Sequence, residues 1–155
     1  MNESPDMTSG DRIESLKTGT LAALSFTVAY SVIAVGNSLV LAEQFEVLAS
    51  LQITIAVNLL VRVAAAWLSG FLFGVTYRYV IREDKNPHLK SGAVLAFSLV
   101  RGLAPVEVNQ NLTNTFWSLG VLGVESIFCF AITRLTLDWA LHHHWLKPFK
   151  SVSVR

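Results

Sequence analysis

The residues of this sequence with the most chemical potential are charged side chains set inside long apolar runs. Arg62, Arg101 and Arg134 each lie within such a run, and the last run also holds Glu125 and Asp138. An arginine at the centre of a membrane helix costs about 2.5–3.5 kcal/mol, so ionisable residues there belong either to buried pairs or to ligand and proton sites. The sequence leaves both interpretations of these charges open.

The depth of each charge along its run suggests which side chains meet. Arg101 and Glu125 lie about seven and about eight residues from the same predicted membrane surface, which is a similar depth at 1.5 Å per residue. We therefore predict an ion pair between Arg101 and Glu125 on two helices, joined by Arg62 or Glu107. A cavity open to lipid or water at Arg101 would favour ligand binding, whereas a dry and fully paired Arg101 would favour a structural role.

The other titratable residues give weaker signals. Arg134 and Asp138 are four residues apart, a spacing at which opposite charges pair on one helix face. The run His142–His144 points its side chains about 100° apart around a helix, so they do not converge on a metal ion. Cys129 is the single cysteine, which excludes an intramolecular disulfide. No known catalytic, phosphate-binding or dinucleotide-binding motif is present, and we predict no catalytic, cofactor or metal site.

Long membrane helices are needed to position these charges. The chain of 155 residues is 52% hydrophobic and only 15% charged, whereas soluble domains carry about 25% charged residues. About 20 apolar residues cross the hydrocarbon core as a helix, and the predicted spans are residues 18–42, 57–79, 89–108 and 117–141. The third span is poor in strongly apolar residues and carries Arg101, so we expect it to insert only with help from its neighbours.

The second predicted span carries a stripe of small residues. Residues at four-residue spacing lie on one helix face, and small residues there let another helix approach closely. Ordinary packing within the bundle explains this stripe better than a dedicated dimer seam does. The small residues are Ala66, Gly70 and Gly74, and the same register continues through Asn58, Arg62 and Arg78.

The charges outside the spans predict the orientation of the chain. Lysine and arginine occur in residues 1–17, 82–90 and 147–155, and they are missing from the connections 43–56 and 109–115. Positive residues gather on the cytoplasmic side of membrane proteins. We therefore predict an all-α, four-helix transmembrane bundle with both termini on the cytoplasmic or stromal side. Residues 1–17 are predicted to form a disordered tail, residues 18–146 the membrane domain and residues 147–155 a basic tail.

The central hairpin, Gly74 to Glu107, has the sequence GVTYRYVIREDKNPHLKSGAVLAFSLVRGLAPVE. It resembles a group of small integral membrane proteins of cyanobacteria and plastids that have no assigned activity. The resemblance implies a thylakoid membrane or a cytoplasmic membrane as the location, and it carries over no site residues.

The function expected from these features is that of a non-enzymatic accessory protein, which helps to assemble or stabilise a larger membrane complex. Two alternatives stay open: a small transporter or channel subunit that works as an oligomer, and a membrane protein that binds a lipid or quinone through Arg101. The expected partners are the lipid bilayer and either another membrane protein or further copies of the chain. Nucleic acid is not expected, because no basic cluster is interleaved with aromatic residues.

Overall fold

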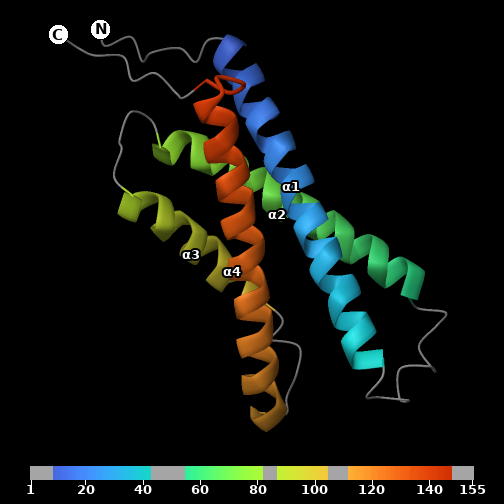
Figure 1. Ribbon diagram of the computed structural model, residues 1–155. Coiled ribbons are helices and arrows are strands. Elements are labelled where there is room, and N and C mark those ends of the chain that lie inside the picture. The colour runs from blue at the N-terminus through green and yellow to red at the C-terminus, as the bar shows by residue number, and fades with distance from the viewer. Residues whose placement is uncertain (1–8, 43–54, 82–86, 105–111, 148–155) are drawn as a thin grey trace, which may run out of the picture.

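The computed structural model describes residues 9–42, 55–81, 87–104 and 112–147, and these ranges are almost wholly helical (Figure 1). The helices are α1 (Ser9–Ala42), α2 (Ile55–Ile81), α3 (Pro87–Leu103) and α4 (Leu112–His142). The described part of the chain therefore confirms the predicted all-α class and its four helices.

Three of these helices are long and apolar enough to cross a membrane. The stretches concerned are residues 9–36 of α1, 59–80 of α2 and 120–142 of α4. Helix α3 has 17 residues, fewer than the roughly 20 that a perpendicular crossing needs, and it packs mainly on α4. The predicted third span, residues 89–108, continues past the described part of the chain.

The first helix begins earlier than its sequence suggested. Helix α1 starts at Ser9, so the prediction of a disordered tail over residues 1–17 is wrong for residues 9–17, and the residues before them lie outside the described part. Ser15 is buried, and Asp11 pairs with an arginine of α2. Contacts with distant segments therefore hold this polar stretch in a helix, and its composition alone does not reveal them.

The four helices run alternately in opposite directions along the bundle (Figure 1). Arg78 near the end of α2 pairs with Asp11 near the start of α1, and Lys90 near the start of α3 pairs with Asp138 near the end of α4. These helix ends lie together, and we call this part of the molecule the Arg78 end. Which side of a membrane it faces remains a prediction.

Two glycines of α2 allow close contact with α1. A β-carbon added to Gly70 would lie 2.9 Å from the carbonyl oxygen of Ala22. A β-carbon added to Gly74 would lie 2.7 Å from the carbonyl oxygen of Thr18. Ala66 on the same face is fully buried. The small-residue stripe therefore packs inside the bundle, against α1.

One phenylalanine from each helix contributes to the centre of the bundle. The ring centroids of Phe26 and Phe130 are 4.5 Å apart. Phe73 lies 5.0 Å from Phe130 and 5.4 Å from Phe97. Tilted and edge-to-face pairs at such distances contribute about 0.5–1.5 kcal/mol each beyond burial. Because lipid is as apolar as these side chains, close packing of this kind holds membrane helices together.

Helix α4 ends in a Schellman turn with a histidine in the position that glycine usually occupies. His144 has a φ of 58°, which lies in the left-handed region. Its N–H donates to the carbonyl of Leu141 at 3.1 Å, and the N–H of Trp145 donates to that of Ala140 at 3.0 Å. The turn satisfies the last helical carbonyls and leads the chain to Lys147, which contacts α2.

Candidate functional site

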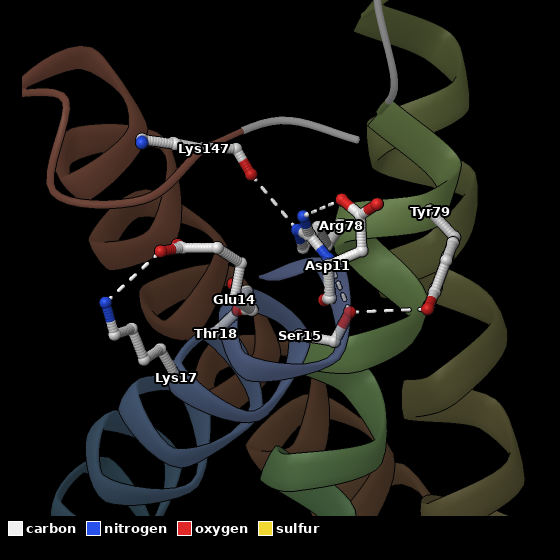
Figure 2. Close-up of polar contacts among 8 residues, drawn as sticks. All are labelled: Asp11, Glu14, Ser15, Lys17, Thr18, Arg78, Tyr79 and Lys147. Atoms are coloured by element: carbon white, nitrogen blue, oxygen red, sulfur yellow. Dashed lines mark hydrogen bonds and ion pairs between the residues drawn. The ribbon is translucent and has the colours of Figure 1, made fainter. Parts of the chain in front are cut away.

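Arg78 of α2 binds two other segments of the chain at one point (Figure 2). Its buried guanidinium donates to the carbonyl oxygen of Asp11 at 2.7 Å and to that of Lys147 at 3.0 Å. It also donates to Ser15 Oγ, and its Nη2 lies 3.3 Å from the Asp11 carboxylate. Ser15 in turn donates to the Tyr79 hydroxyl at 3.3 Å. Arg78 therefore joins the start of α1 and the segment after α4 to the end of α2.

The sequence analysis placed Arg78 on the small-residue face of the second predicted span, but it did not predict these contacts. The signal was present in the stripe, since Arg78 follows Gly74 by one four-residue step and therefore shares the face that packs on α1. Its buried guanidinium and its bonds to α1 and to the segment after α4 indicate a structural role for Arg78.

Asp138 forms the centre of a second polar cluster. Its Oδ1 accepts a hydrogen bond from the Tyr77 hydroxyl of α2 at 2.8 Å and from Lys90 Nζ of α3 at 3.0 Å. Arg134 Nε lies 3.7 Å from Asp138 Oδ2, as the four-residue spacing predicted. Arg134 also donates to Ser91 Oγ of α3 at 3.0 Å. These two members of the predicted charge network therefore join α2, α3 and α4.

Arg101 has a different environment from both clusters. Its Nη1 donates to Ser69 Oγ of α2 at 3.2 Å, and its guanidinium carbon lies 5.1 Å from the ring centroids of both Phe26 and Tyr30. Aromatic faces stabilise a cation, and more so where water is excluded. A guanidinium has five N–H donors, and within the described part of the chain only the bond to Ser69 is formed. The rings of Phe26 and Tyr30 therefore stabilise the charge of Arg101, while most of its N–H donors have no acceptor within the described part of the chain.

A cavity of about 620 Å³ opens beside the Arg101 guanidinium, and we call it the Arg101 cavity. Arg62 of α2 and Glu125 of α4 also line it, so it brings together three members of the predicted charge network. Ligand sites in proteins have volumes of about 300–1,000 Å³ and combine a mostly apolar wall with a few convergent polar groups. The Arg101 cavity has this character. The other polar residues that line it, among those described, are Tyr30, Ser69 and Ser126.

Arg101 and Glu125 share the cavity without forming the ion pair that their depth predicted. The ion pairs of the described residues do not include these two side chains, although Glu125 lies within electrostatic range of Arg101 and Arg62. The prediction of direct pairing is wrong because the guanidinium turns toward Ser69 and the rings of α1. Glu107, the other predicted partner, lies outside the described residues.

The Arg101 cavity lies far from the Arg78 end. Arg62 precedes Arg78 on α2 by more than four turns, roughly 24 Å at 1.5 Å per residue. That length is most of a 30 Å hydrocarbon core. The cavity therefore extends from the centre of the bundle, at Phe97 and Phe130, toward the part of α2 that lies away from the Arg78 end.

The histidines and the cysteine do not form a site. His144 caps α4, and His143 Nδ1 lies 3.0 Å from the Trp139 carbonyl oxygen. Among the described residues no group of histidine, cysteine and carboxylate side chains could hold a metal ion. Cys129 is fully buried in the apolar core.

Comparison of the chain with protein-family models, with curated proteins and with solved structures finds no match. The resemblance to cyanobacterial and plastid membrane proteins therefore remains a prediction, and the function has to be inferred from the site itself.

Proposed function

We propose that this chain is a non-enzymatic integral membrane protein that holds a small amphiphilic molecule beside Arg101. Three helices that are long and apolar enough to span a membrane support its location in a bilayer. One observation carries the binding role: Arg101 borders a cavity of about 620 Å³ and makes a single hydrogen bond within the described chain. A charge removed from water is costly unless it is paired and hydrogen-bonded. A ligand with a polar head supplies hydrogen bonds to Arg101, and the apolar body of the same ligand matches the apolar wall of the cavity.

Filling the cavity tests this proposal. Ala65 lines the cavity, whereas its neighbour Ala64 does not, and both are exposed on α2. The full-length protein and the variants Ala65→Phe and Ala64→Phe are purified in the same mild detergent, and bound small molecules are extracted and quantified by mass spectrometry. We expect the wild type and Ala64→Phe to retain one amphiphile in stoichiometric amount and Ala65→Phe to lose it. Equal retention by all three proteins would contradict the proposal.

The accessory role in a larger membrane complex stays a prediction from the sequence, as does a thylakoid or cytoplasmic membrane location. Native purification in mild detergent addresses the role directly. Co-purification of a large complex would support the accessory role, whereas an isolated oligomer that carries a flux in liposomes would support the transport alternative.

A further inference from the structure

We infer that the Arg101 cavity takes the head of a lipid with a single negative charge, and that the lipid tail lies in an adjoining groove between α1 and α4. This inference rests on the proposed function and adds the charge and shape of the ligand. The charge of the cavity, the lining of the groove and the length of the groove each contribute to it.

The lining of the Arg101 cavity sets the charge of the head. Arg62 and Arg101 carry two positive charges and Glu125 carries one negative charge, so the described lining has one positive charge in excess. An uncompensated charge at membrane depth is unfavourable, and a head with one negative charge neutralises it. Guanidinium groups bind the oxygens of phosphate and carboxylate groups through two parallel hydrogen bonds. A phosphodiester or a carboxylate head therefore fits this cavity.

A second cavity adjoins the first and is suited to an apolar tail. It has a volume of about 720 Å³ and shares Glu125 with the Arg101 cavity. Ile33 of α1 lines it together with apolar residues of α4, among them Val124 and Phe128. Glu125 is the only ionisable residue among the described residues that line this groove. A polar head and an apolar tail therefore find matching surfaces in two cavities that share Glu125 as a lining residue.

The length of the groove along α4 is close to the thickness of one leaflet of a bilayer. The groove follows α4 from Gly120 to Ile132, roughly 18 Å at 1.5 Å per residue. Half of a 30 Å hydrocarbon core is about 15 Å. Along α4 the groove covers the same levels as the Arg101 cavity, whose lining on α4 extends from Leu122 to Phe130. A tail in the groove therefore lies along α4 beside the head in the cavity.

Lipid selectivity of the full-length protein tests the charge of the head. Delipidated protein in detergent is titrated with dioleoyl phosphatidylglycerol, oleate, dioleoyl phosphatidylcholine and dioleoylglycerol, and the bound fraction is measured by native mass spectrometry. We expect at least one of the two anions to bind about tenfold more tightly than the zwitterionic and neutral lipids, a factor that corresponds to one hydrogen bond to a charged group. The tighter anion identifies the head as a phosphodiester or a carboxylate.

Three variants assign this selectivity to the cavity. Arg101→Gln removes the preference for anions. Arg101→Lys keeps part of this preference because the positive charge remains. Binding by Arg101→Lys also shows that the loss of preference in Arg101→Gln is not simply a failure to fold. Glu125→Gln strengthens anion binding, since a like charge leaves the cavity. Arg12→Gln removes the same charge as Arg101→Gln from an exposed position at the Arg78 end, and it leaves the preference unchanged.

Equal binding of all four lipids overturns the inference, as does an anion preference that survives Arg101→Gln or weakens in Glu125→Gln. In any of these cases the variant Ala65→Phe tests whether the proposed function still holds. If Ala65→Phe lowers binding of the lipids, the cavity is still a binding site and only its charge selectivity is wrong. If Ala65→Phe has no effect, the proposed function fails as well.

Discussion

Arg78 and Arg101 are both arginines in apolar helices, yet their surroundings differ. Arg78 donates to α1 and to the segment after α4, including two backbone carbonyls. Among the described residues Arg101 makes one hydrogen bond, to Ser69, and it borders a cavity. At the scale of single residues, the first side chain is therefore expected to matter for stability and the second for binding.

Removal of Arg78 should destabilise the protein strongly. Arg78→Met leaves the carbonyls of Asp11 and Lys147 and the hydroxyl of Ser15 without their donor, and we expect a loss of about 3 kcal/mol, since hydrogen bonds to charged groups contribute about 1.5–3 kcal/mol each. The free energy of unfolding in mixed micelles measures this effect. Arg12→Met, at an exposed position of α1, is the control and should change stability little. Equal effects of the two substitutions would show that the Arg78 contacts do not hold the bundle end together.

His144→Gly should stabilise the protein. The left-handed conformation of His144 costs an L-residue about 1–2 kcal/mol that glycine does not incur, and we expect part of this to be gained. His143→Gly is the control, because residue 143 has no positive φ. Glycine there adds conformational entropy to the unfolded chain and removes the contact of the His143 ring with Trp139. The melting temperature should rise for His144→Gly and fall for His143→Gly. A fall for both would mean that the His144 side chain contributes more than its strained backbone costs.

At the scale of helices, the contact between α1 and α2 depends on two glycines. Gly74→Ala would place a β-carbon 2.7 Å from the Thr18 carbonyl oxygen, and Gly70→Ala one 2.9 Å from that of Ala22. The helices would have to move apart, and we expect each variant to lose about 1–3 kcal/mol, the usual cost of overpacking. Gly92→Ala on α3 meets nothing within 4 Å and should be neutral or stabilising. If unfolding measurements show an equal loss of stability for Gly92→Ala, Gly70→Ala and Gly74→Ala, the result would contradict the close α1–α2 contact.

The helices and the small-residue stripe could be predicted because both depend on local sequence. Apolar length marks a span, and the four-residue register that contains Gly70 and Gly74 marks a packing face. The contacts of Arg78 with Asp11 could not be predicted, since they join residues far apart in the chain. The meeting of Arg101 and Glu125 at one cavity was predicted from depth, but depth does not set the direction of a side chain, and the predicted ion pair is not formed.

At the scale of the whole molecule, the contacts of Arg78 bring the start of α1 and the end of the described chain to one end of the bundle. Reporters fused before Met1 and after Arg155 should therefore lie on the same side of the membrane, and the distribution of lysine and arginine predicts the cytoplasmic or stromal side. Protease protection of each reporter in sealed vesicles measures this. Reporters on opposite sides would contradict the arrangement of the four helices, and both reporters on the outer side would contradict only the predicted orientation.

The central claim is that the Arg101 cavity holds a ligand rather than closing on itself. An experimental density map of the full-length protein in lipid nanodiscs tests it most directly. We expect elongated density with its head within hydrogen-bonding distance of Arg101 and its tail along α4 between Val121 and Ile132. A map in which Arg101 and Glu125 meet in a direct ion pair and leave no space for a ligand would contradict the claim.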